Sequence, residues 1–434
     1  MWKGLKKDMG EIKKKILLGC VADDFTGASD AASFLQKAGM HPVLVNEVPE
    51  DIQLPEQTDA IVVALKSRTA SREEAVEETM RAVKWLDGTG AERFYFKYCS
   101  TFDSTREGNI GPVADAVMEY FHQPYTILCP ALPVNGRIVK DGCLYVCGVP
   151  LAESPMKNHP LTPMWDSRIK NLIEAQSRYP AVELFGKLKD REDLKEMLNR
   201  EEKASEHFYV IPDYVDDADG KQIVEYFGNL KFLTGGSGLL EFLGAYISAG
   251  SGEKTKIEEN NSRGVVFAGS CSVATLGQIE NYKKKGHLSM KLDPLELLNG
   301  EQTKERIVEF VTQHPEDEVL IYSSDTADRI KEVQKMGREK IAGLIEETLS
   351  GAAAALAKKG YGRIVVAGGE TSGAVTKALG YEAFEIGPSV APGVPVMTPL
   401  DNRNMKLVLK SGNFGQEDFF ARALAMTKGE KYHE

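Results

Sequence analysis

The feature that most constrains the fold of this chain is a repeated unit of three parts. A short apolar run is followed by a loop rich in Gly, Ser, Thr and Asp, and then by a segment of helical periodicity. Such alternation is typical of parallel α/β sheets, in which each strand leads through a loop into a covering helix. The clearest apolar runs are Ile16–Ala22, Ala60–Leu65, Phe94–Tyr98, Val265–Ala268, Val319–Ser323, Ile364–Ala367 and Leu407–Lys410. The sequence therefore predicts an α/β protein with open, mostly parallel sheets flanked by helices.

The runs fall into two groups, which predicts two domains with one open sheet each. The chain has 434 residues, and a single domain commonly holds about 100–200 residues. Residues 248–263 are polar, rich in Gly and Ser, and lack apolar periodicity, so we place a linker there. We expect one domain over residues 1–247, this linker, and a second domain over residues 264–434.

Composition and charge exclude several classes of protein. Apolar residues make up 42% of the chain and charged residues 27%, which is typical of a soluble globular protein. The formal net charge of −11 argues against a nucleic-acid or anionic-membrane partner, because both repel a protein of the same sign. No apolar run has the length of a membrane helix, and the start of the chain does not resemble a signal peptide. We therefore expect a cytoplasmic protein.

Small residues follow three predicted strands of the second half, in the segments 269–272, 368–373 and 411–415. Such loops let backbone N–H groups approach an anion, and the following helix adds its positive end, so phosphate is the expected ligand. The candidate nucleotide contacts are Ser270, Ser272, Gly368, Gly369, Glu370, Thr371 and Gly412. Among phosphate ligands, the carboxylate of Glu370 is expected to face Mg²⁺ or its waters. The alternative for any one loop is a tight turn without a ligand, and neither the P-loop nor the dinucleotide pattern is present.

The loops of the first half mix acids, bases and hydroxyl groups, and this mixture suits a small polyhydroxy acid. The candidate substrate contacts are Asp23, Asp24, Arg68, Lys97, Ser104, Thr105, Asn135 and Arg137. Arg68 or Arg137 can bind a carboxylate through two parallel hydrogen bonds. Asp24 or Asp23 can act as the base that accepts the proton of an attacking hydroxyl. The alternative for both aspartates is a structural role as caps of the following helix, and the two roles are compatible.

Taken in order, these loops resemble those of the four-carbon acid sugar kinase family. The stretches that carry the resemblance are ADDFTGA (Ala22–Ala28), KYCSTFDST (Lys97–Thr105), CPALPVNGR (Cys129–Arg137), HPLTPM (His159–Met164), AGSCS (Ala268–Ser272), AGGETSG (Ala367–Gly373) and LKSGNFG (Leu409–Gly415). Several motifs in fixed order argue against a chance match. The resemblance implies an N-terminal acid-sugar-binding domain, a C-terminal nucleotide-binding domain, ATP as donor, Mg²⁺ as companion ion, and nucleotide contacts at Ser270, Gly368–Thr371 and Gly412.

Within that family, Lys97–Thr105 and His159–Met164 are most similar to the corresponding segments of 3-oxo-tetronate 4-kinases, which phosphorylate a terminal hydroxyl. Leu132 and Ile138 stand where an aromatic residue and a threonine are expected. Kinases for D-threonate, D-erythronate or 3-oxo-isoapionate therefore stay open as alternatives. An alternative of another class is a non-catalytic sensor that closes on an acid sugar, although it gives the small-residue loops no role. The base rate of symmetric assemblies favours a homodimer.

Overall fold

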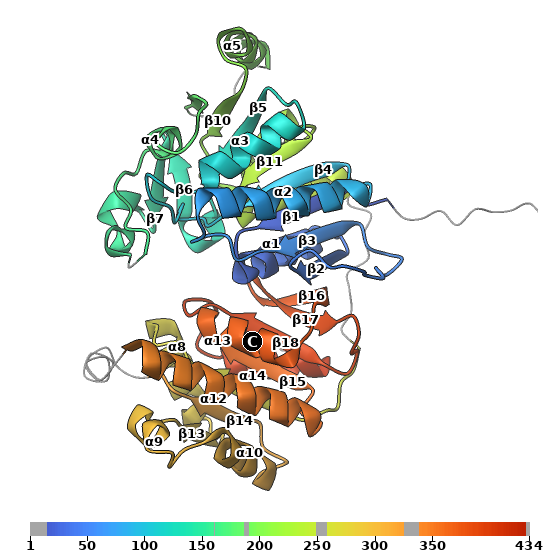
Figure 1. Ribbon diagram of the computed structural model, residues 1–434, viewed down its shortest axis with the longest axis vertical. Helices are drawn as coiled ribbons and strands as arrows, with labels where there is room; N and C mark the ends of the chain where they lie inside the picture. Colours follow the sequence, from blue (N-terminus) through green and yellow to red (C-terminus); the bar gives the residue numbers. More distant parts are fainter. Residues whose placement is uncertain (1–14, 160, 186–190, 249–257, 325–337, 431–434) are drawn as a thin grey trace, which may run out of the picture.

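The chain folds into a long mixed sheet flanked by helices (Figure 1). The structure is a computed structural model, and it describes residues 15–159, 161–185, 191–248, 258–324 and 338–430. The predicted α/β class with mostly parallel strands is confirmed. Most of the predicted linker, residues 249–257, lies outside the described residues.

The N-terminal half comprises the described residues up to 248. Its strands are β1 (Leu18–Ala22), β2 (Pro42–Asn46), β3 (Ala60–Ala64), β4 (Arg93–Lys97), β5 (Tyr125–Cys129), β6 (Arg137–Lys140), β7 (Cys143–Val146), β8 (Val149–Pro150), β9 (Ala181–Leu184), β10 (Phe208–Pro212) and β11 (Phe232–Gly235). Its helices are α1 (Phe25–Lys37), α2 (Arg72–Gly88), α3 (Ile110–Tyr120), η1 (Pro133–Asn135), η2 (Leu151–Glu153), η3 (Pro155–Asn158), α4 (Ile169–Glu174), α5 (Arg191–Ala204), α6 (Asp217–Phe227), η4 (Ser237–Leu239) and α7 (Leu240–Ser248). Strands β6, β7 and β8 form a small separate antiparallel sheet.

The C-terminal half comprises the described residues from 258 onward. Its strands are β12 (Gly264–Ala268), β13 (Ser289–Lys291), β14 (Val319–Tyr322), β15 (Arg363–Ala367), β16 (Ala383–Ala391), β17 (Val394–Pro399) and β18 (Lys406–Lys410). Its helices are α8 (Val273–Lys284), α9 (Pro294–Leu298), α10 (Lys304–Gln313), α12 (Arg338–Lys358), α13 (Gly369–Leu379) and α14 (Phe419–Lys428).

All seven predicted strands are present, as β1, β3, β4, β12, β14, β15 and β18, with ends within one or two residues of those expected. In the N-terminal half, β1 lies between β3 and β4, and Ala22 is paired with Ala64 on one side and Lys97 on the other. In the C-terminal half, β15 lies between β12 and β18, and Ala367 is paired with Ala268 and Lys410. Because these strands are parallel, the loops that follow them meet at one edge of each half.

The two expected sheets are joined edge to edge, which sequence reasoning did not predict. Strand β16 pairs antiparallel with β2, placing Phe384 opposite Leu44, and it also pairs with β17, which continues to β18. The ring of Phe25 at the start of α1 meets that of Phe384 edge-on, with centroids 6.1 Å apart. The β16–β17 hairpin therefore belongs to the C-terminal half in sequence and borders the N-terminal half in space (Figure 1).

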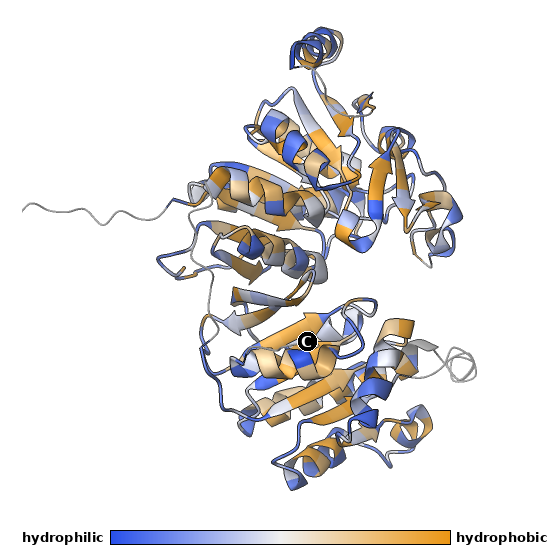
Figure 2. Ribbon diagram, turned by 180° about the vertical axis from the view of Figure 1, so that it is seen from behind, coloured by the Kyte–Doolittle hydropathy of each residue, from blue (hydrophilic) through white to orange (hydrophobic). Residues whose placement is uncertain are grey.

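The central strands are buried along their whole length, as required of strands that are covered on both faces. Figure 2 shows the strands mainly in hydrophobic colours and the outer faces of the helices in hydrophilic ones. Charged residues interrupt this pattern at strand ends, where Lys97, Arg363, Lys406 and Lys410 are buried. None of the helices in the described ranges has both the length and the hydropathy of a membrane span.

Candidate active site

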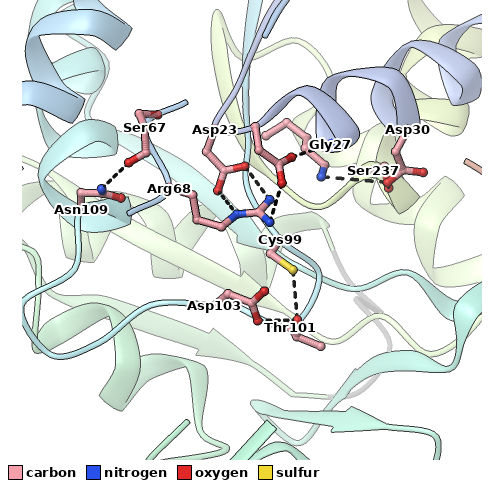
Figure 3. A network of polar contacts seen from close by, with 12 residues as sticks. Asp23, Gly27, Asp30, Ser67, Arg68, Cys99, Thr101, Asp103, Asn109 and Ser237 are labelled. Atoms are coloured by element: carbon pink, nitrogen blue, oxygen red, sulfur yellow. Dashed lines mark hydrogen bonds and ion pairs between the residues drawn. The ribbon is translucent and has the colours of Figure 1, made fainter. Parts of the chain in front are cut away.

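Asp23, which follows β1, meets Arg68 from the loop after β3 (Figure 3). The next residue, Asp24, meets the same guanidinium group. Arg68 donates from Nε and Nη2 to the two carboxylate oxygens of Asp23, at 2.9 and 2.8 Å. Its Nη1 lies 2.6 Å from Asp24 Oδ2. The two carboxylates more than offset the effect of burial, so the pKa of Arg68 lies well above its usual range. We expected Arg68 or Arg137 to bind a substrate carboxylate through two parallel hydrogen bonds, but in this structure Arg68 makes these two bonds to Asp23.

Asp24 combines a structural contact with access to solvent. It precedes α1, and its Oδ1 accepts the backbone N–H of Gly27 at 2.6 Å. The side chain of Asp24 is 31% exposed, whereas those of Asp23 and Asp30 are 5% and 8% exposed. Of these three aspartates, only Asp24 can be reached by a ligand without rearrangement.

Lys97 and Asp30 form a buried pair beside this cluster. Lys97 ends β4, and its Nζ lies 4.0 Å from Asp30 Oδ2. The same oxygen accepts a hydrogen bond from Ser237, and Figure 3 labels both Asp30 and Ser237. Burial raises the pKa of Asp30. The pKa of Lys97 is raised because the carboxylates of Asp30, Asp24 and Asp23 outweigh burial. Sequence reasoning missed Asp30, whose available signal is an acidic residue among the small and apolar residues of α1.

Ser104 and Thr105 lie in the loop after β4, where their hydroxyl groups have partners inside the protein. Ser104 is buried, and its Oγ accepts from Gln176 Nε2 at 3.0 Å. The Thr105 hydroxyl accepts a backbone N–H of its own turn at 3.3 Å. Asn109, which sequence reasoning missed, ties this loop to the one after β3 by donating to the carbonyl of Ser67 at 2.8 Å.

Asn135 and Arg137 lie on a different wall. Gly136 between them is left-handed, with φ of 71°, as an Asn-Gly turn predicts. Arg137 donates from Nη1 to the carbonyl of Asn135, and its buried Nε has no hydrogen-bond partner among the described residues. Within the described part of the chain, no hydrogen bond or ion pair links Arg137 to Asp24. The predicted substrate residues therefore form two groups rather than one.

A cavity of about 620 Å³ lies between the two halves. Asn135, Arg137 and the residues Ser33, Phe34 and Lys37 of α1 line it from the N-terminal half. The C-terminal half contributes segments 389–393 and 413–416 together with residues of α14. One predicted substrate wall thus faces the loop that follows Gly412.

The three small-residue loops of the C-terminal half are packed against one another. A Cβ atom on Gly412 would come within 2.3 Å of Ser270 Oγ, and one on Gly269 within 2.1 Å of Thr371 Oγ1. Gly368, with φ of 133°, adopts a backbone conformation that favours glycine. The three loops therefore lie in close contact, and an added Cβ atom at Gly412 or Gly269 would displace a neighbouring hydroxyl group.

Ser272 has a structural contact on each side, whereas Gly369 and Glu370 are open. Ser272 Oγ accepts the backbone N–H of Thr275 at 3.2 Å and lies 2.5 Å from the carbonyl oxygen of Gly412. Gly369 and Glu370 form the exposed first turn of α13. Burial, and then the charge of Glu370, raise the pKa of Glu346 on α12.

Lys410, at the end of β18, is a functional candidate that sequence reasoning missed. Its side chain is buried, and Nζ donates to Thr275 Oγ1 and to the carbonyl of Gly412, each at 3.0 Å. Burial lowers the pKa of this lysine to about 7. The available signal was a lysine that directly precedes a small-residue loop at the end of an apolar run.

Two family models match the two halves of the chain. One is described as a sugar-binding N-terminal domain and matches residues 18–243, and the other as a nucleotide-binding C-terminal domain and matches residues 265–420. Together with the acidic cluster and the small-residue loops, these matches define a class of protein that joins a sugar-binding domain to a nucleotide-binding domain.

Similar proteins narrow this class. A 3-oxo-tetronate kinase of Cupriavidus necator is 42% identical over 435 residues, covering 97% of this chain and 99% of the relative. One from Haemophilus influenzae is 40% identical, covering 94% and 100%. A crystal structure of a Haemophilus influenzae protein has a TM-score of 0.81 at 40% identity and covers 94% of this chain and 100% of its own. The chain belongs to the four-carbon acid sugar kinase family.

Proposed function

We propose that this protein is an ATP-dependent kinase that transfers the γ-phosphoryl group to the terminal hydroxyl of a four-carbon acid sugar, with 3-oxo-tetronate as the acceptor. Relatives of that activity, about 40% identical over nearly their whole length, support the choice of acceptor. The observation that carries the proposal is the pairing of two unlike sites. One half holds an accessible carboxylate in a charged cluster, and the other holds converging small-residue loops.

Each half of the chain would therefore bind one of the two substrates. Residues 1–247 would bind the acid sugar and residues 264–434 the nucleotide, with residues 248–263 as linker. The cavity between the halves, bordered by Arg137 on one side and Asn413 on the other, supports an arrangement in which donor and acceptor meet. A cytoplasmic homodimer is the expected setting.

On the donor side, backbone N–H groups of the three loops and the hydroxyl groups of Ser270 and Thr371 would bind the phosphates of ATP. Ser272, whose hydroxyl donates to the Gly412 carbonyl, would contribute its place in the loop. Mg²⁺ is commonly held by one or two carboxylates together with substrate phosphates, so Glu370, in the exposed first turn of α13, fits the ion. Bound there, Mg²⁺ would neutralise phosphate charge. No cluster of three or more metal ligands occurs among the described residues.

On the acceptor side, Asp24 would accept the proton of the attacking hydroxyl, because it is the accessible carboxylate of the cluster. Arg68, which contacts both Asp23 and Asp24, would hold that carboxylate in place. Arg137, which lines the cavity, would bind the substrate carboxylate. Lys97, Ser104, Thr105 and Asn135 would complete the acid-sugar site.

The test of this function is ADP release from Mg²⁺·ATP by the purified protein with a panel of acids. The panel contains 3-oxo-tetronate, both enantiomers of threonate and erythronate, and 3-oxo-isoapionate. Preferred turnover of 3-oxo-tetronate is expected. Preferred turnover of another acid would replace the acceptor but keep the kinase. Acid binding without ADP release would favour the sensor instead.

The proposed base has its own test. Asp24→Asn should lower kcat by about 100-fold or more while leaving the KM for ATP near the wild-type value. The matched control is Asp216→Asn, since Asp216 caps α6 through the same kind of hydrogen bonds and lies outside the site. Near-normal kcat in Asp24→Asn would remove Asp24 as the base.

A further inference from the structure

Three donors converge on the carbonyl oxygen of Gly412, in the loop after β18. Ser272 Oγ lies at 2.5 Å, Thr275 Oγ1 at 2.9 Å and Lys410 Nζ at 3.0 Å. Lys410 also donates to Thr275 Oγ1 at 3.0 Å. An ammonium has no acceptor capacity, so the Thr275 hydroxyl accepts a hydrogen bond from Lys410 and donates its own O–H to the carbonyl oxygen of Gly412. The carbonyl is therefore fixed in direction by three hydrogen bonds.

Fixing this carbonyl also fixes the next N–H group. The Gly412–Asn413 peptide is trans, and in a planar trans peptide the N–H points opposite to the C=O. The N–H of Asn413 therefore points away from Lys410. Asn413 is exposed and borders the cavity between the halves. Within the described residues, no acceptor binds this N–H.

The charge of Lys410 is not balanced by the protein. The residue is 1% exposed, and no carboxylate of the described ranges lies within ion-pair distance. Its other neighbour is the ring of Phe419, whose centroid is 5.5 Å from Nζ. A buried cation without a partner is costly, and the cost falls when an anion binds nearby. Such a position is unfavourable for folding and favourable for binding phosphate.

We propose that Lys410 is a positioning residue for the phosphates of the bound nucleotide. It holds the Gly412 carbonyl inward so that the Asn413 N–H faces the ligand, and it places a positive charge behind the loop. This inference rests on the proposed function, since it assigns the phosphates to this loop. It adds a cation to a site whose other proposed phosphate donors are backbone N–H groups and hydroxyl groups.

The test uses Mg²⁺·ATP as the probe and two matched variants of the full-length protein. Lys410→Met removes the ammonium and keeps most of the stem, whereas Lys406→Met does the same at the other end of β18. Lys406 is also buried, at 4% exposure, and donates to a threonine hydroxyl, Thr398 Oγ1, at 3.0 Å. We expect calorimetric affinity for ATP to fall about tenfold or more in Lys410→Met and to change little in Lys406→Met.

A positioning role also predicts effects that a packing role would not produce. The KM for ATP should rise in Lys410→Met while the KM for the acid sugar stays near the wild-type value. In the wild type, the affinity for ATP should weaken as the pH rises above about 7, because Lys410 of the ATP-free protein loses its proton there. Lys410→Met should lack that part of the pH dependence. Thr275→Val, which removes the relaying hydroxyl without changing the volume much, should weaken ATP binding in the same direction.

The opposite results would overturn the proposal. An affinity for ATP equal to that of the wild type in soluble, folded Lys410→Met would contradict the positioning role. If Lys410→Met does not fold, an unchanged affinity for ATP in Thr275→Val would contradict the role instead. The affinity for ATP is measured without an acid sugar, so this test does not depend on the identity of the acceptor. A wild-type protein that binds ATP but phosphorylates none of the acids would contradict the proposed acceptor and would leave the test of Lys410 valid.

Discussion

At the scale of single residues, the acidic cluster depends on the shape of one guanidinium group. Arg68 contacts Asp23 through two nitrogens and Asp24 through the third, so it holds two loops and two carboxylates at once. A lysine has one nitrogen on a flexible stem and cannot reproduce this geometry. The fixed position of Asp24 should therefore depend on arginine specifically, not only on positive charge.

Arg68→Lys is accordingly expected to lower kcat by about 100-fold, because a small displacement of a catalytic group has an effect of that order. The KM for ATP should remain near the wild-type value, since the nucleotide loops are in the other half. Steady-state kinetics would measure both. Arg168→Lys is the matched control, because Arg168 also pairs with a carboxylate, that of Glu183 at 2.7 Å, outside the cluster. Equal effects of the two substitutions would contradict this role of Arg68.

Lys410 should also affect stability in a pH-dependent way. Its folded pKa of about 7 lies below its ordinary value of 10.5. Below pH 7 both states are protonated and the folded state contains a costly buried charge. Between pH 7 and 10.5 the unfolded chain holds a proton that the folded chain lacks, so stability rises with pH. The stability of wild type relative to Lys410→Met should therefore increase across this window, as measured by chemical denaturation at pH 6, 8 and 10. A constant difference would contradict the lowered pKa.

At the scale of helices and strands, the start of α1 has no room for a side chain at Gly27. A Cβ there would lie 2.5 Å from Asp24 Oδ1 and 2.5 Å from Lys97 Nζ. Gly27→Ala should therefore displace both groups, lowering kcat strongly and the free energy of unfolding by about 1–3 kcal/mol.

The matched substitution is Gly343→Ala in α12, where an added Cβ meets nothing within 4 Å. It should leave kcat unchanged and raise the free energy of unfolding by about 0.4–1 kcal/mol, because alanine restricts the unfolded chain. Chemical denaturation and steady-state kinetics on both variants would check the pair. Similar behaviour of the two variants would show that α1 tolerates the extra atom.

The positions of the strands could be predicted from the sequence, but the pairing of strands that are distant in the sequence could not. β1 and β15 are continuous apolar runs that end in polar loops, and this pattern is local. The pairing of β2 with β16 depends on two segments more than 300 residues apart, and local patterns contain no signal for it. The same limit applied to the site. Loops bearing Asp24 and Gly412 were recognised from composition, whereas the contact of Arg68 with Asp23 depends on β3 lying beside β1.

At the scale of the whole molecule, the β16–β17 hairpin makes the two halves parts of one sheet. Backbone pairing between β16 and β2 includes Glu385 opposite Val43, and Phe384 packs on Phe25 at the start of α1. Unfolding one half alone would expose the edge of β2 or of β16, which is unfavourable. We therefore expect the halves to unfold together, so that a ligand of one half stabilises both.

All three tryptophans of the sequence precede residue 248, and Trp85 and Trp165 lie among the described residues of the N-terminal half. The C-terminal half contains no tryptophan, so tryptophan fluorescence does not report on it directly. Mg²⁺·ATP, proposed to bind the other half, should nevertheless raise the melting temperature seen by tryptophan, by about 3 °C at 100 times its Kd. Phe384→Ala, which weakens the packing between the halves, should reduce this shift while leaving ATP affinity similar to that of wild type. The alternative result in the wild type is that ATP raises the melting temperature of a second transition seen by circular dichroism and leaves that of the tryptophan transition unchanged. That result would show that the two halves unfold independently. In that case the continuous sheet would not couple nucleotide binding to the acid-sugar site.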